Sequence, residues 1–122
     1  MNQAISVLNT TIDTVNGVLV VLPEGRLDYD AAAGFQATLE QALAGADKPR
    51  GMVIDCTSLT YVSSAGLRSF LIGARAAQAA RIRFLVCSQQ KSVAEVFTVS
   101  GFSKIIPALP DRAAAEAAAG AA

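Results

Sequence analysis

The segment VIDCTSLTYVSSAGLR, residues 53–68, decides the fold. It begins as an apolar strand that ends at Asp55, continues through a loop over residues 57–63, and enters a helix that opens with Ser63-Ser64-Ala65-Gly66-Leu67. In open α/β sheets, functional groups collect outside the carboxyl ends of the strands. The segment therefore predicts an α/β fold whose functional edge lies at the two serines.

Apolar strands and amphipathic helices alternate on both sides of this segment. Asn16-Gly17 is a two-residue hairpin signal, which joins an edge strand over residues 5–12 to a buried strand over 18–22. The run Pro-Glu-Gly at 23–25 is expected to end that strand. We then expect a helix from Asp28 or Asp30 to Leu43, a strand over 51–56, a helix over 64–80, a strand over 81–87, a helix over 92–99, a short strand at 105–106 and an alanine-rich helix over 111–120. This order predicts a mixed, mainly parallel sheet of about five strands flanked by four helices.

The composition excludes several functional classes. The chain has 122 residues, with 10 basic and 10 acidic side chains and a net charge of zero. A single domain over residues 1–122 fits this length. The charge balance argues against a nucleic-acid partner and is compatible with a monomer or a weak dimer. Neither a secretory signal nor an apolar run of about 20 residues is visible, so we expect a cytoplasmic protein with no membrane partner.

Catalytic and metal-binding patterns are missing from the sequence. It contains no histidine, and its two cysteines lie in separate apolar runs, at Cys56 and Cys87. Zinc sites of the common kind and serine hydrolases with a histidine base are therefore excluded. No glycine-rich phosphate loop is present either. We expect no enzymatic activity, no catalytic residue, no metal and no cofactor, with both cysteines as reduced core residues.

The hydroxyl groups at the start of the central helix have two interpretations. A serine there can cap the free N–H groups of the first turn, or it can carry a phosphate, because those groups and the helix dipole favour negative charge. On residue types alone, capping is the more common role. Gly66 in the first turn lowers helix propensity, so its presence indicates close approach of another backbone or of a partner.

Three stretches together resemble the STAS domain, the fold shared by anti-sigma factor antagonists and the cytosolic tails of sulphate transporters. Gly25-Arg26-Leu27-Asp28 resembles the family's G-x-L-D motif. Val53-Ile54-Asp55-Cys56, followed by Thr57, resembles its third strand. Val62-Ser63-Ser64-Ala65-Gly66-Leu67 resembles its phosphorylation motif. The resemblance covers nearly the whole chain.

The resemblance implies an anti-sigma factor antagonist that works by partner switching. In that family the unphosphorylated antagonist binds an anti-sigma factor, which is itself a serine kinase, and the phosphorylated form releases it. A serine phosphatase restores the first state. The phosphorylated serine stands two residues before the glycine, which is Ser64 here. The family often has an aspartate before that serine, where this chain has Ser63, and Ser63 is therefore a rival acceptor.

The resemblance also suggests a surface that binds the partner. Its candidate residues are Asp28, Asp55, Tyr61, Val62, Ser63, Ser64, Ala65, Gly66, Leu67 and Arg68.

Several of these residues keep a purely structural alternative. Asp28 and Asp55 could assist phosphotransfer or hold the kinase's Mg²⁺, or else serve as a helix cap and a loop hydrogen-bond acceptor. Leu59, Tyr61, Val62 and Leu67 could form an exposed apolar rim, although Val62 and Leu67 suit the core equally well. Arg68 is positioned to meet an acidic partner.

Two other roles remain open for a chain of this kind. It could be a scaffold subunit of a stress-sensing assembly, or the small STAS component of a lipid-transport ABC complex. The first predicts stable large oligomers of the pure protein, and the second predicts co-purification with a permease and its ATPase.

Overall fold

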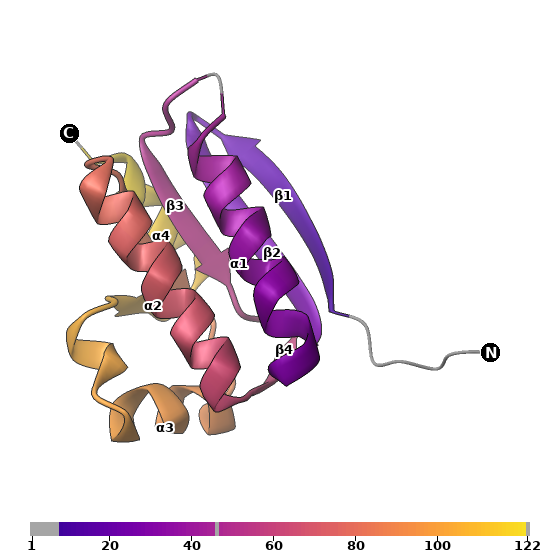
Figure 1. Cartoon of the computed structure of the whole chain (residues 1–122). Coiled ribbons are helices and arrows are strands. Elements are labelled where there is room, and N and C mark those ends of the chain that lie inside the picture. Colours follow the sequence, from indigo (N-terminus) through magenta and orange to yellow (C-terminus); the bar gives the residue numbers. More distant parts are fainter. Residues whose placement is uncertain (1–7, 46, 122) are drawn as a thin grey trace.

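The structure, a computed structural model, describes residues 8–45 and 47–121. Its elements are, in chain order, β1 (Asn9–Val15), β2 (Val18–Leu27), α1 (Tyr29–Leu43), β3 (Gly51–Asp55), β4 (Leu59–Val62), α2 (Ser64–Ala79), β5 (Arg83–Cys87), α3 (Lys91–Val99), the 3₁₀ helix η1 (Phe102–Lys104), β6 (Ala108–Leu109) and α4 (Arg112–Gly120). The predicted α/β fold is confirmed, with six strands in place of about five. Helices α1 and α2 lie side by side on one face of the sheet, and α4 lies behind it (Figure 1).

The sheet is mainly parallel. Its strands follow the order β1-β2-β3-β5-β6, and β4 pairs with the far end of β2. Among the strands of the described residues, only β1 is antiparallel to its neighbour, with Val15 opposite Val18. The turn between them places Asn16 at φ 51° and Gly17 at φ 80°, the left-handed conformation that two-residue hairpins require. The hairpin prediction is confirmed for residues 9–15, while residues 5–7 of the expected edge strand lie outside the described residues.

Strand β2 corrects the expectation that Pro23-Glu24-Gly25 ends it. Pro23 lies opposite Thr10 and the strand continues to Leu27. Gly25 has φ 115°, and the pairing with β4 shifts register between Gly25 and Arg26. This irregularity bends the strand without ending it. Residues 59–62, expected as part of a loop, pair with the bent end as β4. The glycine is thus needed for a bulge.

The last strand also differs from the prediction. Residues 105–106 are not a strand, and β6 is formed by Ala108–Leu109. Gly101 at φ 83° begins the 3₁₀ turn that precedes them. Ile106 is fully buried, whereas Ile105 is exposed. Ile106 therefore anchors this turn in the core, while Ile105 faces solvent.

The two faces of the sheet are packed differently. Under α1 and α2, the rings of Phe35 and Phe70 lie 5.3 Å apart between centroids, and those of Phe70 and Phe97 lie 5.2 Å apart. The other face packs against α4 through Ala115 and Ala119. Helix α2, whose first residue is Ser64, belongs to the layer with the aromatic core.

Candidate functional site

Ser63 is the residue that caps helix α2. It has extended backbone, and its Oγ accepts a hydrogen bond from the Gly66 N–H at 3.1 Å. Its own N–H donates to the Leu27 carbonyl oxygen at 2.9 Å. The first bond caps the helix, and the second ties the start of α2 to the end of β2. The capping role foreseen for a serine at this position thus falls to Ser63.

Ser64 is in a different situation although it is the next residue. It is the first residue of α2 and is exposed. Among the described residues its hydroxyl has no recorded hydrogen-bond partner. It lines an open groove of about 450 Å³ together with Ala65, Leu67, Arg68, Leu71 and Phe102. A reagent or a partner can reach this hydroxyl without disturbing the cap.

Leu71 and Phe102 are groove residues that the sequence analysis did not single out. Leu71 lies seven residues after Ser64, a spacing that places both on one helical face and could have identified it. Phe102 comes from η1, which follows α2 only after β5 and α3. No local pattern connects Phe102 to the serines, so its place in the groove depends on the tertiary fold.

Gly66 is required by a close contact inside the chain. A Cβ at this position would lie 2.6 Å from the Leu27 carbonyl oxygen and 2.8 Å from its Cγ. Of the two explanations for this glycine, the structure supplies the first, close approach of another backbone. The result is that α2 starts directly beside the end of β2.

The expectation of an exposed apolar rim is wrong for Leu59, and for Val62 and Leu67 the core alternative holds. Leu59, Val62 and Leu67 are core residues, with exposed fractions of 0%, 5% and 9%. Tyr61 alone of the four is exposed, at 40%. The Arg26 guanidinium lies over its ring, 4.1 Å from the centroid, a distance suited to a cation–π contact. The two ends of β4, Leu59 and Val62, face the core, while Thr60 and Tyr61 between them are exposed, a pattern that the loop interpretation did not foresee.

Both aspartates make hydrogen bonds to nearby parts of the chain. Asp28 caps α1, and its Oδ1 accepts from the Ala31 N–H at 3.0 Å. Asp55 is almost fully buried, and its Oδ1 accepts from the N–H and the hydroxyl of Thr57 at 3.1 and 2.6 Å. Asp55 lines a separate cavity of about 220 Å³ beside β1 and β2. The Ser64 groove does not include it.

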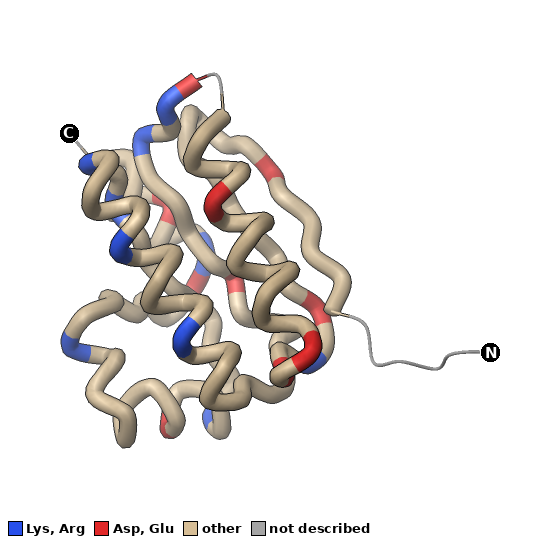
Figure 2. The backbone as a smooth tube through the Cα atoms, viewed as in Figure 1, with Lys and Arg blue, Asp and Glu red and all other residues tan. Residues whose placement is uncertain are grey.

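The charge around the site is uneven although the chain is neutral. Helix α1 carries Asp30 and Glu40 and no basic residue, while α2 carries Arg68 and Arg75 and no acidic one. Figure 2 shows this separation between the two neighbouring helices. The groove at Ser64 therefore lies on the basic side, with the exposed Arg68 one turn along the helix.

The remaining candidates for chemistry are the two thiols, and both are fully buried. Burial raises the pKa of Cys87 to about 11 and raises the pKa of Cys56 further. A thiol in this state is a poor nucleophile. Within residues 8–45 and 47–121, no group of three or more acidic or cysteine side chains is arranged to hold a metal ion. Among the helices described there, none combines the length and apolar character of a membrane span.

Comparisons with known proteins agree with the motifs. The STAS domain model matches residues 9–115. A protein of Bordetella bronchiseptica that is named as an anti-sigma factor antagonist, BtrV, is 35% identical over 112 residues, which cover 91% of this chain and 94% of that protein.

Solved structures share the fold at lower identity. An anti-sigma factor antagonist from Mycobacterium paratuberculosis superposes with a TM-score of 0.76 at 23% identity, over 92% of this chain and 93% of the other. SpoIIAA in its unphosphorylated form gives 0.76 at 18% identity, over 93% and 99%. The phosphorylated form of the Bacillus protein gives 0.67 at 17%, over 88% and 97%. With the family model covering most of its length, the chain belongs to the STAS domain family.

Proposed function

We propose that this chain is an anti-sigma factor antagonist that switches partners through phosphorylation of Ser64. In the unmodified form it binds a cognate anti-sigma serine kinase, and phosphorylation releases that kinase. The observation that carries the proposal is a difference between the two adjacent serines. The Ser63 hydroxyl caps α2, whereas Ser64 is exposed and takes no part in the cap. The relative BtrV and the two solved forms of SpoIIAA support it.

The physical effect of the phosphate is local. It adds nearly two negative charges at the positive end of the α2 dipole, a position that tolerates them. Arg68 stands four residues along the same face, where a side chain can pair with it. The fold should therefore survive phosphorylation. A phosphate buried against a partner without a matching cation costs several kcal/mol, and each 1.4 kcal/mol weakens binding about tenfold.

The proposed contact surface combines exposed and supporting residues. Ser64, Arg68 and Tyr61 are exposed and can touch a partner directly, and Ser63 and Ala65 are half-buried beside them. Val62, Gly66 and Leu67 lie beneath this surface and fix the position of α2. Asp28 and Asp55 support this surface from the side, because their carboxylates accept hydrogen bonds from residues two or three positions along the chain and so shape the neighbouring loops.

A binding protein of this kind needs no catalytic residue of its own. The kinase supplies the phosphoryl group, and a serine phosphatase removes it. The chain would act in the cytoplasm with soluble partners. The uncharged, largely inert character of its thiols and the lack of histidine fit a regulatory binding role.

The test uses paired variants of the two serines. Ser64→Ala and Ser64→Asp baits are compared with Ser63→Asp, which adds the same charge one residue earlier and keeps a side chain able to cap the helix. A pull-down from the source organism's lysate, read by mass spectrometry, should recover a soluble ATPase of the histidine-kinase-like fold on Ser64→Ala and on Ser63→Asp. The same ATPase should be lost from Ser64→Asp.

Other outcomes would point to the alternative roles. Equal recovery on both Ser64 baits would refute the switch. Recovery of a membrane permease with its ATPase would favour the lipid-transport component. Stable large oligomers of the pure protein in light scattering would favour the scaffold subunit.

A further inference from the structure

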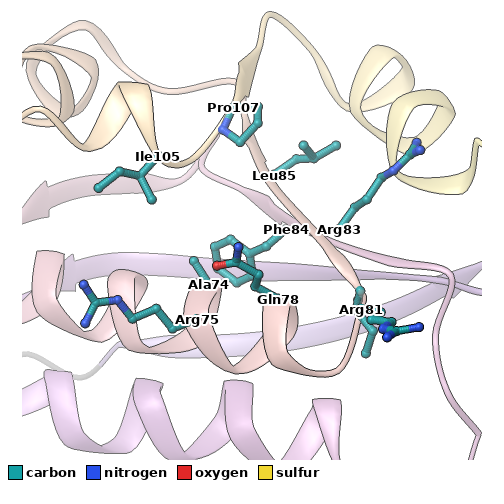
Figure 3. Close-up of a pocket in the computed structure, with 10 residues that line it drawn as sticks. Ala74, Arg75, Gln78, Arg81, Arg83, Phe84, Leu85, Ile105 and Pro107 are labelled. Atoms are coloured by element: carbon teal, nitrogen blue, oxygen red, sulfur yellow. The ribbon is translucent and has the colours of Figure 1, made fainter.

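A second groove lies along the C-terminal half of α2, away from Ser64. It is lined by Arg75 and Gln78 of α2, by Phe84 and Leu85 of β5, and by Ile105 and Pro107 of the connection to β6. Figure 3 shows these side chains around an open hollow between the helix and that connection. Its volume is about 500 Å³, and it shares no residue with the groove at Ser64.

Phe84, one of the residues that line this groove, lies just before the part of β5 that β6 covers. Strand β6 pairs only with Val86 and Cys87. The Val86 N–H donates to the Pro107 carbonyl oxygen at 3.0 Å, while the Cys87 carbonyl accepts from Cys56 on the opposite side. Because backbone groups alternate along a strand, the N–H and C=O of Phe84 point to the same side as those of Val86. No strand covers them there among the described residues.

Pro107 is the reason that β6 does not extend over Phe84. In a parallel ladder of this register, the next hydrogen bond would run from the N–H of residue 107 to the Phe84 carbonyl. Proline has no N–H, so the ladder stops at this point. An unpaired edge of this kind is a template for a strand from another chain.

The rim of the groove is basic and its wall is apolar. Arg75 and Arg81 line it and are exposed, and no aspartate or glutamate lines it. The Arg83 guanidinium is directed to α4, where it donates to the Ala118 carbonyl oxygen at 2.8 Å. Arg75 and Arg81 are therefore the arginines that can meet an occupant of the groove. Ile105 is 56% exposed at its edge. An occupant should therefore offer carboxylates beside apolar side chains.

We propose that this groove binds an extended acidic segment of a partner protein by β-strand addition. The backbone of the segment pairs with the N–H and C=O of Phe84. Its apolar side chains pack against Ile105 and Pro107, and its carboxylates meet Arg75 and Arg81. Main-chain hydrogen bonds supply affinity in this mode, and the side-chain contacts supply selectivity. The site gives the chain a second interface, independent of Ser64.

The experiment selects the peptide without assuming its sequence. Random linear peptides are displayed and panned against the full chain, with counter-selection on the double variant Arg75→Glu/Arg81→Glu. Enriched peptides should alternate acidic and apolar residues. Titrated into the isotope-labelled chain, a synthetic copy should shift the amide signals of residues 82–85 and 105 and slow hydrogen exchange at Phe84. Enrichment without acidic residues, or shifts confined to residues 61–68, would overturn the proposal.

Two variants and one control variant make the result specific. Arg75→Glu should weaken binding of the peptide at least about tenfold, which corresponds to about 1.4 kcal/mol. Lys48→Glu, the same charge reversal at an exposed residue outside the groove, should leave it unchanged. Pro107→Ala restores the missing N–H. It should also weaken binding of the peptide, because β6 can then extend over Phe84. Equal binding by wild type, Arg75→Glu and Pro107→Ala would refute the site.

The two other occupants of such a groove give distinct signals. If decanoate shifts the amides of residues 82–85 and no peptide does, the ligand is a small anionic amphiphile and the peptide proposal is wrong. If these amides shift with protein concentration alone, a second copy of the chain occupies the edge, which also contradicts it.

Discussion

The two faces of the sheet are covered by helices that bury side chains of very different size. On one face, α1 and α2 enclose the side chains of Phe35, Leu39, Phe70 and Phe97, all at most 2% exposed. On the other, α4 presents Ala115 and Ala119 to Val20 and Val53. The first layer is wide and aromatic, and the second depends on small residues that let a helix approach closely.

The difference bears on the proposed phosphorylation of Ser64. Ser64 begins the helix that the aromatic layer holds, so a charge added there acts on the surface while the helix stays in position. Helix α4 covers the other face with only two buried residues, Ala115 and Ala119. Elements with few buried contacts open most readily. We therefore expect changes under α2 to affect the whole fold, and changes near α4 to be milder and more local.

The largest effect is expected from Phe70→Ala, which removes the ring that contacts both Phe35 and Phe97. A cavity of this kind costs about 3–5 kcal/mol. Urea unfolding followed by circular dichroism measures it as a lowered midpoint with an unchanged slope. A loss below about 1 kcal/mol would show that the aromatic layer does not dominate stability.

Gly51→Ala tests the thin layer by overfilling it. The added Cβ would lie 2.6 Å from the Ala119 carbonyl oxygen and 2.7 Å from its Cβ. Because α4 can shift, we expect a loss of about 1–3 kcal/mol, smaller than that of Phe70→Ala. Thermal unfolding checks the size, and hydrogen exchange should show faster opening over residues 112–120 than over α2. Uniform acceleration throughout the chain would contradict the picture of a separable layer.

The two serines predict a contrast of about 1 kcal/mol between neighbouring positions. Ser63→Ala removes the cap at Gly66 and should cost about 1 kcal/mol. Ser64→Ala removes an exposed hydroxyl outside the cap and should change stability by less than about 0.5 kcal/mol. Chemical unfolding of both variants under the same conditions gives the comparison. Equal losses would mean that both hydroxyls support the helix.

The smallest effect concerns the thiols, one in each layer. Cys56 packs in the core under α1 and α2, and Cys87 packs in the core under α4. Alkylation by iodoacetamide at neutral pH should be slow for both and faster for Cys87, because its cover opens more readily. Peptide mass mapping after short exposures distinguishes the two sites. Faster labelling of Cys56 would reverse the assignment of the thin layer.

The raised thiol pKa values also predict alkaline sensitivity. Burial raises the pKa of Cys87 from its ordinary 9.0 to about 11. The unfolded chain thus releases this proton before the folded chain does, so stability falls as the pH rises from about 9 to about 11. Cys87→Ala should make the dependence less steep over that range, as measured by urea unfolding, while Cys56, whose pKa burial also raises, keeps part of it. An unchanged slope in Cys87→Ala would show that other groups cause the alkaline loss.

The fold was largely predictable from local patterns. The caps Asp28, Ser63 and Asp111 accept from the first-turn N–H groups as their side chains suggest, and Asn16-Gly17 forms the expected hairpin. Strand β4 was missed because residues 59–62 span only four positions, show no alternation of core and solvent residues, and pair with the end of β2, which is distant in the sequence. The strand predicted at 105–106 was wrong because one buried isoleucine beside an exposed one resembles a strand. Neither error is visible without the partner segment.

What the sequence determined by itself is the order of the elements other than β4 and β6, the start of α2 and the identity of the two adjacent serines, because capping and periodicity act within a few residues. Only the tertiary structure decided how those serines differ. The contact of Gly66 with Leu27 fixes the approach of α2 to β2, and the Ser63 bonds to Leu27 and Gly66 occupy one serine while Phe102 joins the groove of the other. The contacts of Leu27 with Ser63 and Gly66, and the place of Phe102 in the groove, join residues that are distant in the chain. Local propensity carries no information about which of these residues will meet.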